Sequence, residues 1–478
     1  MRRLPKGQKN ISGLHIAFTR AYVHLALMTH MQKTEMTPDE TLSFLLETCK
    51  KAGASDADAR FGRSMGENVS VLNGKLETIE RDESAAVALR CFYGKSQANV
   101  SGTDLTREGL TILATRCAKM AKASPEDPYC GLVAPDMLAH HRPEFDLSGD
   151  ADYSPDRLQA EALEAEAAAL DVAGIAQVDS CTAGWGQSES WFAATNGFRE
   201  HHAGGSSGIG LSAVAQKDGA MERDYASRSS RRRADRLSPY EIGKLAGERT
   251  IARLGPTKLS SRKAAIIYDK RISASLLSAF KSAISGPSIA RGVSFLKDKL
   301  GEQVFAKGMS IIDDPFRPRG MGTRSSDGEG LPVQETALIA DGVLTTWLLN
   351  SPSARQLGLQ PNGFSSTAFG DPPGISTSNL YMAAGELSVE EMMQQTGEGL
   401  IVTSMFGPSI NPNSGDYSVG VAGIWYEQGA PAYPVSEVTI AGDLPSMFAR
   451  LIPASDLEFL SSQDAPSLLI EDMTIAGT

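Results

Sequence analysis

Pairs of Asn or Asp with Gly recur along the chain, and they constrain its fold more than any other feature because they close tight turns between antiparallel strands. The pairs are Asn73-Gly74, Asn196-Gly197, Asp218-Gly219, Asp327-Gly328, Asp341-Gly342 and Asn362-Gly363. Around the first pair, strand-forming residues occupy 68–72 and 76–80, and further strands are expected over 84–93 and 97–101. The sequence therefore predicts antiparallel sheets.

Helices are expected where a capping box precedes an apolar stripe. Capping boxes, in which Ser or Thr is followed three residues later by Glu, begin at Thr37, Ser238 and Ser388. Helices are also expected over 106–123, 154–173 and 272–284. Helices packed on antiparallel strands define an α+β fold. We expect an N-terminal antiparallel sheet with packed helices and a C-terminal, mainly antiparallel β domain that is barrel-like or sandwich-like.

The first residues and the rest of the chain have net charges of opposite sign. Residues 1–35 carry a net charge of +5 and the whole chain carries −11, which leaves −16 for the remainder. The first capping box follows this basic segment directly. We therefore treat 1–35 as an N-terminal extension that does not conform to the fold, 36–235 as an N-terminal α+β domain and 236–478 as a C-terminal, mainly β domain.

Composition also restricts the compartment and the partners. An acidic body repels nucleic acid, so no nucleic-acid partner is expected. No apolar run reaches the ~18 residues of a membrane span, and Arg20 and His24 interrupt the apolar stretch that would act as a signal peptide. The five cysteines show no Cys-x-x-Cys spacing, which favours reduced thiols. We expect a cytoplasmic protein without membrane association.

Three patterns resemble functional motifs. Residues 204–208 match Gly-x-Ser-x-Gly, the turn that carries a hydrolase nucleophile, but the alternating residues after them predict a strand and not the required helix. The adjacent pairs His140-His141 and His201-His202 point apart on a strand or helix, so we expect no zinc site there. The arginines within 228–236 fit an anionic-ligand patch or a solvated passage from strand to helix, and we favour the solvated passage.

Two carboxylates lie in a glycine-rich loop. Asp327 and Glu329 alternate with glycine. In such a loop carboxylates bind a hard cation, act as acid and base, or accept hydrogen bonds from the backbone of a turn. Spacing alone leaves these alternatives open, with the structural one slightly favoured.

The segment 407–423 is the second candidate for a functional surface. Its many small residues allow the backbone to approach a ligand or a partner chain. The candidate residues are Asn411, Asn413, Gly415, Asp416 and Ser418. The alternative is an ordinary hairpin connection. We predict a functional surface on this segment, with Asp327 and Glu329 nearby.

Several short segments occur along residues 36–460 in an order that is specific although no single one of them is. They are 73–77, Tyr129-Cys130-Gly131-Leu132, 294–301, Asp313-Asp314-Pro315, 327–330, Asn379-Leu380-Tyr381, 399–403, 414–418 and 433–442. In this order the chain resembles the TldD/PmbA family, and in particular its PmbA (TldE) branch. The resemblance implies a cytoplasmic zinc metallopeptidase formed by a TldD and a TldE chain, acting on peptides or unfolded segments.

The resemblance also implies which chain holds the metal. In that family the zinc motif His-Glu-x-x-x-His belongs to the TldD chain. Matching Leu276-Leu277 to the family's leucine pair puts Ser278, Ala279 and Ala283 at the His, Glu and His positions. The implied subunit has no catalytic residue and no cofactor of its own, and we expect no activity from it alone.

The implied partners are a TldD-like subunit that holds the zinc and a peptide substrate. A homo-oligomer of the isolated chain stays open. The alternative function is a protein-binding module without peptidase activity that modulates another protein, such as DNA gyrase.

Overall fold

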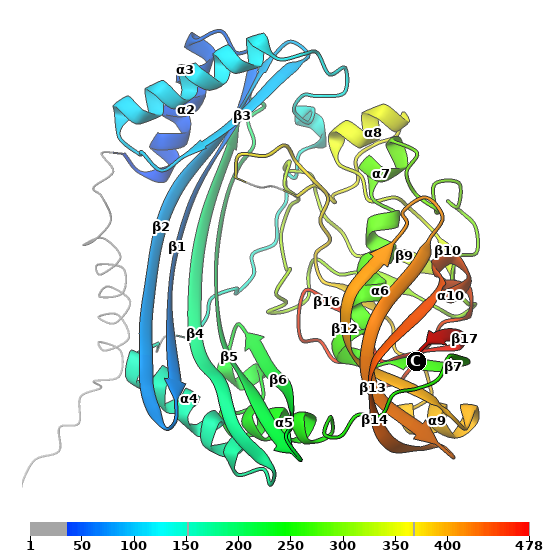
Figure 1. Cartoon of the computed structure of the whole chain (residues 1–478). Helices are drawn as coiled ribbons and strands as arrows, with labels where there is room; N and C mark the ends of the chain where they lie inside the picture. Colours follow the sequence, from blue (N-terminus) through cyan, green and yellow to red (C-terminus); the bar gives the residue numbers. More distant parts are fainter. Residues whose placement is uncertain (1–35, 151–152, 367–368, 478) are drawn as a thin grey trace, which may run out of the picture.

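The computed structural model describes residues 36–150, 153–366 and 369–477, so the predicted extension 1–35 lies outside the described residues. Two layers face each other (Figure 1): a long curved sheet from the N-terminal half, and a barrel with a smaller sheet from the C-terminal half. The predicted α+β class is confirmed. Of the two C-terminal alternatives, the barrel forms.

The N-terminal sheet is antiparallel throughout, with the strand order β3-β2-β1-β4-β5-β6. Its strands are β1 Asp56–Leu72, β2 Lys75–Tyr93, β3 Ser96–Gly102, β4 Ile175–Ala194, β5 Arg199–Lys217 and β6 Ala220–Ser230. Asn73 and Gly74 join β1 to β2 with φ angles of 55° and 71°. A type I′ turn requires such a left-handed pair, so this turn prediction is confirmed.

Strand β2 is longer than predicted. The two strands expected over 76–80 and 84–93 are one continuous strand. It continues because Arg81 and Glu83 pair with Glu67 and Met65 of β1. Pairing with a neighbouring strand outweighs the low strand propensity of charged residues.

Two helix pairs cover one face of this sheet and leave the other face to the C-terminal layer (Figure 1). The helices are α2 Pro38–Lys51 with α3 Arg107–Ala123, and α4 Pro155–Leu170 with α5 Pro239–Ile251. The first pair shares a core with Phe61 and the second with Val69. Both side chains point to the same face because they lie an even number of residues apart on β1. The capping boxes at Thr37 and Ser238 are confirmed.

Helix α5 corrects the predicted domain boundary at 235/236. The helix packs on α4, β5 and β6. Gly243 approaches α4 so closely that an added Cβ would lie 2.1 Å from the carbonyl oxygen of Ala165. The helix therefore belongs to the N-terminal layer, and the chain passes to the C-terminal layer between Ile251 and Arg262.

Five C-terminal strands close into a barrel. They are β7 Arg262–Tyr268, β12 Gly399–Ile410, β13 Asp416–Glu427, β14 Ala430–Asp443 and β17 Leu468–Ala476. Strand β7 pairs with β12 in parallel and with β17 in antiparallel orientation, and β14 pairs with β17 to complete the ring. Helix α6 (Lys270–Ala283) packs Leu276, Leu277 and Phe280 into the same core. The short strand β15 (Ile452–Pro453) pairs with β17.

A second sheet of short strands has the order β10-β9-β8-β11-β16. Its strands are β8 Ile311–Asp313, β9 Thr336–Ala340, β10 Val343–Leu344, β11 Leu380–Met382 and β16 Gln463–Asp464. Four further helices are α7 Gly286–Ala290, α8 Ser351–Leu357, α9 Val389–Thr396 and α10 Leu444–Arg450. The capping box at Ser388 is confirmed.

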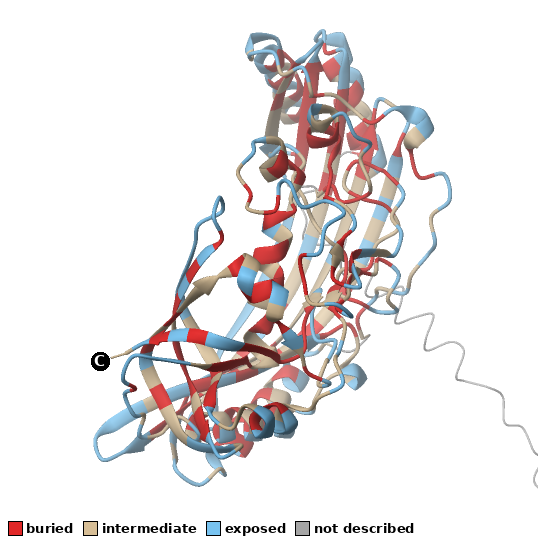
Figure 2. Ribbon diagram, turned by 90° about the vertical axis from the view of Figure 1, so that its right-hand side faces the viewer, coloured by how far each residue is buried: buried red, intermediate tan, exposed pale blue. Residues whose placement is uncertain are grey.

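Each layer has a hydrophobic core of its own. Figure 2 shows buried stretches in both layers, and they correspond to separate clusters of buried apolar side chains. In the part of the chain that the structure describes, no helix is long and apolar enough to cross a membrane.

Candidate functional site

A groove of about 880 Å³ lies between the two layers. Its floor is the face of β1, β4 and β5 that carries no helices, and residues from the loop 321–328 together with Ser365, Ser366 and Ser376 form the opposite wall. The wall contacts the sheet directly, since Arg60 Nη2 donates to the carbonyl of Gly328 at 2.9 Å. Both halves of the chain therefore build the groove.

Small residues alternate along the floor. Those on neighbouring strands are Ser64, Gly66, Gly186, Ser188, Gly204 and Ser206. Because the side chains of a strand alternate between its faces, small residues at every second position leave one face flat. Ser206 lies inside β5 and no helix follows it, so the strand prediction for 204–208 is confirmed and the hydrolase turn is excluded.

Glu200 connects the floor to the opposite wall. Its carboxylate accepts hydrogen bonds from the hydroxyls of Ser325 at 3.0 Å and Ser326 at 2.7 Å. His202 Nε2 lies 3.2 Å away and Arg142 Nη1 lies 3.7 Å away. Burial raises the pKa of Glu200, but the hydrogen bond and charge of His202 and the two hydroxyls outweigh it, so the pKa lies below its ordinary value. Glu200 is therefore an ionised, fully engaged carboxylate.

The two histidines beside Glu200 point to opposite faces. His202 lines the groove, whereas His201 stacks on Trp191, with ring centroids 4.5 Å apart. Among the described residues, no group of three or more His, Cys, Asp or Glu side chains could hold a metal ion. Because His201 and His202 lie on opposite faces of β5, the pair does not form a chelating face.

Asp327 and Glu329 are buried in the wall, where their carboxylates bind backbone. Asp327 accepts hydrogen bonds from the N–H groups of Glu329 and Leu331 at 2.9 Å and of Ser365 at 3.0 Å. Glu329 accepts from the N–H of Ser351 at 2.9 Å. Burial raises the pKa of Asp327 to about 7, and the charge of Glu329 adds to the shift. Of the open alternatives, this geometry favours the backbone-binding one.

Arg60 projects from β1 into the groove over the ring of Phe192, 4.2 Å from its centroid. Burial lowers the pKa of Arg60 to about 10, although the charges of Asp58 and Glu200 act in the opposite direction. The guanidinium group thus keeps its charge at neutral pH in a half-buried position.

The arginine run 228–236 is not the solvated passage that we favoured. Arg232 pairs with Asp146 at 2.9 Å, and Arg236, whose side chain is only 3% exposed, pairs with Glu161 at 2.8 Å. Arg231 is buried and lines the groove. The run fixes the coil before α4 against the sheet, which its sequence composition did not indicate.

The predicted surface on 407–423 is the β12–β13 hairpin. Asn411, Asn413, Asp416 and Ser418 are exposed, and the polar groups at the tip bond to each other. Gly415 has a φ of 86°, and an added Cβ would lie 2.5 Å from Cδ of Pro445. The hairpin is therefore closely packed where Gly415 meets Pro445.

The hairpin and the loop with Asp327 and Glu329 are not joined by the hydrogen bonds or ion pairs of the described residues. Asp327 belongs to the groove and the hairpin to the barrel.

The positions that the family resemblance assigns to zinc ligands lie on α6. Ala279 and Ala283 are buried in the barrel core, where their methyl groups offer no donor atom. The hydroxyl of Ser278 receives a hydrogen bond from Gln463, whose side-chain oxygen accepts from Lys281 at 2.9 Å. Zinc requires imidazole, thiolate or carboxylate ligands, so these residues do not fit the metal.

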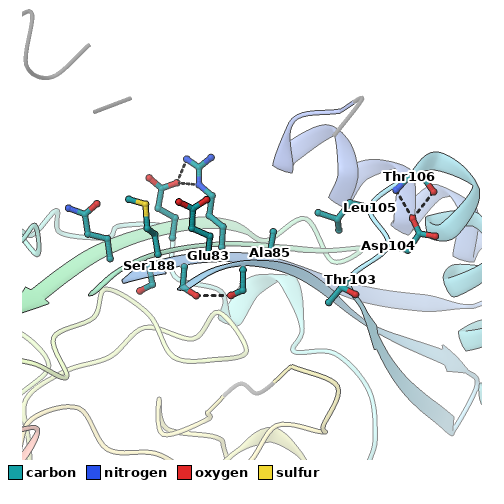
Figure 3. Close-up of a pocket in the computed structure, with 13 residues that line it drawn as sticks. Glu83, Ala85, Thr103, Asp104, Leu105, Thr106 and Ser188 are labelled. Atoms are coloured by element: carbon teal, nitrogen blue, oxygen red, sulfur yellow. Dashed lines mark hydrogen bonds and ion pairs between the residues drawn. The ribbon is translucent and has the colours of Figure 1, made fainter. Parts of the chain in front are cut away.

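A second cavity, of about 710 Å³, lies on the helix-bearing side of the sheet (Figure 3). The loop that leads into α3, residues 103–106, forms one side. Its charged residues are largely matched by partners, since Arg63 pairs with Glu189 and Asp104 accepts hydrogen bonds from Thr106. The groove between the layers, with its uneven charge, is the stronger candidate.

Three family profiles match the chain in order. They are PmbA/TldA metallopeptidase domain 1 over residues 57–121, the central domain over 149–254 and the C-terminal domain over 261–477. The chain belongs to the PmbA/TldD metallopeptidase family. The boundary between the central-domain and C-terminal-domain profiles coincides with the passage of the chain from one layer to the other after α5.

Relatives in this family match nearly the whole chain. The metalloprotease PmbA of Escherichia coli O157:H7 is 32% identical over 442 residues, which cover 92% of this chain and 96% of the relative. A PmbA homologue of Haemophilus influenzae is 30% identical over 440 residues, with coverage of 92% and 96%. The predicted resemblance to the PmbA branch is confirmed.

Solved structures share the fold of this chain. TldE from Thermococcus kodakarensis has a TM-score of 0.80 at 20% identity, and the match covers 91% of this chain and 100% of that chain. A putative modulator of DNA gyrase from Bacteroides thetaiotaomicron has a TM-score of 0.85 at 23% identity, with coverage of 92% and 99%. At these identities the likeness shows the fold alone.

Sequence reasoning missed the groove and three of its charged residues, Arg60, Glu200 and Arg324, and it set aside the anionic-ligand alternative for the run that contains Arg231. One available signal was the alternation of Gly and Ser along 184–190, which has the period of a strand face that carries no core. No local signal pointed to Arg60 or Arg324.

Proposed function

We propose that the chain is the subunit without zinc of a two-chain zinc peptidase, acting in the cytoplasm on peptides or unfolded segments. The observation that carries the proposal is the composition of α6, because Ser278, Ala279 and Ala283, which the resemblance places at the ligand positions, offer no side chain that binds zinc. A TldD-like chain supplies the metal, and this chain forms one wall of the substrate channel.

Part of the edge of β5 supports peptide binding in the groove. Strand β6 pairs with β5 only from Ser207 onward. Beyond it the N–H of Gly205 donates to the carbonyl of Leu147 at 2.9 Å and the carbonyl of Arg199 accepts from Arg142, which leaves 201–203 as the open part of this edge among the described residues. Glu200, His202 and Gly204 line the groove. An extended peptide adds to such an edge through main-chain hydrogen bonds, and the flat floor leaves room for its side chains.

Co-expression with the TldD-type chain of the same organism tests the assignment. We expect the two chains to purify as one complex, with zinc bound to the partner and cleavage of an unfolded substrate only by the pair. The matched control is a partner in which both motif histidines are replaced by alanine, which should assemble but not cleave.

Two outcomes contradict the proposal. One is stoichiometric zinc or peptidase activity in this chain alone. The other is a pull-down that recovers DNA gyrase and no TldD-type chain, which favours the protein-binding alternative.

The β12–β13 hairpin is proposed to contribute to assembly or substrate binding. Asp416 is exposed, and its carboxylate accepts a hydrogen bond from Ser414 within the tip. Replacing it by alanine removes a polar group without a backbone constraint. We expect Asp416→Ala to leave the melting temperature nearly unchanged but to weaken assembly or peptidase activity of the pair. Wild-type assembly and cleavage would show that the hairpin is only a connection.

A further inference from the structure

Three arginines line the groove, and none of them forms an ion pair with a described residue. Within the described chain, no carboxylate oxygen lies within 4 Å of the guanidinium nitrogens of Arg60, Arg231 or Arg324. Arg60 donates to the carbonyl of Gly328, and Arg324 donates to neutral oxygens that include the hydroxyl of Ser376 at 2.9 Å. Their contacts hold the side chains in place without neutralising them.

The carboxylates that face these arginines are already engaged. Glu200 accepts from two serine hydroxyls and lies beside His202 and Arg142. Asp327 accepts three backbone hydrogen bonds. Asp82 lines the groove but is exposed, so water screens its charge.

The charges of Asp58, Asp146 and Asp313 also act on the arginines, but these carboxylates bind Arg90, Arg232 and the N–H of Ser378. The three arginines therefore have no dedicated counter-ion among the described residues.

The donors of the three guanidinium groups are used to different extents. Arg231 donates from Nε, Nη1 and Nη2 to backbone carbonyls, including that of Gly320 at 3.2 Å. Arg324 keeps a buried Nε without a partner. Arg60 donates from Nη2, while hydrogen bonds from its Nε and Nη1 to other described residues are absent. Arg231 thus contributes charge, whereas Arg60 and Arg324 retain donors.

Arg231 is buried, and Arg60 and Arg324 are half-buried. Charges withdrawn from water in native proteins are paired or bind an ion, because an unpaired charge loses its hydration without compensation. Burial is also the main cause that lowers the pKa of Arg60, Arg231 and Arg324. A guanidinium fork matches a carboxylate in geometry as well as in charge. The missing group is therefore an anion that enters the groove from outside.

We propose that the groove binds a carboxylate of its peptide ligand through Arg60 and Arg324, with Arg231 adding positive charge behind them. The substrate class is then acidic peptides, or peptides held by the C-terminal carboxylate. This inference rests on the proposed function in taking the ligand to be a peptide.

Four fluorescein-labelled nonapeptides of Ser, Ala and Thr test the proposal by fluorescence anisotropy with the purified full chain. They carry a central Glu or Gln, each with a free or an amidated C-terminus. We expect peptides with the recognised carboxylate to bind at least about tenfold more tightly than the Gln peptide with an amidated end. Added salt should reduce the difference.

The four peptides distinguish the two sources of the carboxylate. A gain that follows Glu assigns the site to an acidic side chain, and a gain that follows the free end assigns it to the C-terminus. Equal binding of all four overturns the carboxylate inference but leaves the peptide groove standing. Absence of binding overturns the inference as well, while the co-expression experiment still decides the proposed function.

Arg60→Gln and Arg324→Gln locate the site. Each should reduce the preference for the carboxylate to about threefold or less, whereas Arg116→Gln, on the exposed face of α3, should leave it unchanged. Circular dichroism checks that each variant is folded. If Arg60→Gln is not folded, Arg60→Lys, which keeps the charge, replaces it in the binding measurement. If folded variants of both arginines keep the wild-type preference for the carboxylate peptides, the anion binds elsewhere and the assignment is overturned.

Discussion

Asp327 shows how a single buried side chain shapes the wall of the groove. Both of its oxygens accept backbone N–H groups, from Glu329 and Leu331 on one side and from Ser365 on the other. Two loops that are distant in sequence are thereby held together. A carboxylate used in this way is a structural acceptor, and any change of its chemistry affects the loops before it affects a ligand.

Asp327→Asn should destabilise the protein. An asparagine supplies one acceptor oxygen, so either the two N–H groups at Oδ1 or that of Ser365 would face an amide NH₂ group. The cost of leaving a buried group unsatisfied is about 1–3 kcal/mol. Calorimetry should show a lower melting temperature than for Asp314→Asn, whose carboxylate accepts from the N–H of Phe316 in a less buried loop. Equal losses would contradict the assigned role.

The same residue should make stability depend on pH. Burial first, and then the charge of Glu329, raises the pKa of Asp327 from 3.8 to about 7. The folded state therefore holds a proton that the unfolded state releases. The resulting stabilisation is present below about pH 4 and is lost as the pH rises through about 7. We expect the melting temperature of the wild type, relative to Asp327→Asn, to fall between about pH 4 and pH 7. A difference independent of pH would contradict this shift.

Turns and helix starts were predictable at the scale of elements, because their signals are local. The capping boxes at Thr37, Ser238 and Ser388 and the turn at Asn73-Gly74 all formed as expected. Strand β2 was divided wrongly because its continuity depends on pairing with β1, which single-strand propensity does not contain.

The β12–β13 hairpin allows a matched test of what glycine does in an element. Gly407 and Gly415 both have positive φ, but only Gly415 has a neighbour that an added Cβ would strike. Gly407→Ala should cost about 1 kcal/mol of backbone strain. Gly415→Ala should cost more, because Pro445 must move. Melting temperatures of the two variants provide the comparison, and equal values would show that the hairpin base yields freely.

The whole molecule depends on contacts between residues that are far apart in sequence, and these could not be predicted. Arg60 and Gly328, which meet across the groove, are separated by 268 positions. The coil after α3 is held in the same manner, because Arg355 of α8 donates to the carbonyls of Tyr129, Gly131 and Leu132. The turn and capping signals indicated two domains, yet no short pattern indicates which side chains face each other across them.

Arg355→Met should release this coil while both cores remain folded. Three carbonyls lose their donor, so the segment 124–143 should open more often. Limited trypsin digestion is expected to cut at Lys122 or Arg142 several-fold faster than in the wild type. Arg291→Met, which removes an exposed arginine after α7, is the control and should not change the pattern. Unchanged cleavage in Arg355→Met would show that other contacts hold the coil.

The closure of the barrel has a consequence for biosynthesis. Strand β7 lies between β12 and β17, and β17 follows it by about 200 residues in the chain. When β7 leaves the ribosome, neither of its neighbours has yet been made, and its buried side chains Ile266 and Ile267 are without cover. The nascent C-terminal half therefore exposes an apolar strand for most of its synthesis, which is the condition under which chaperones are needed. The N-terminal sheet, built largely from hairpins, completes its pairing much earlier on the ribosome.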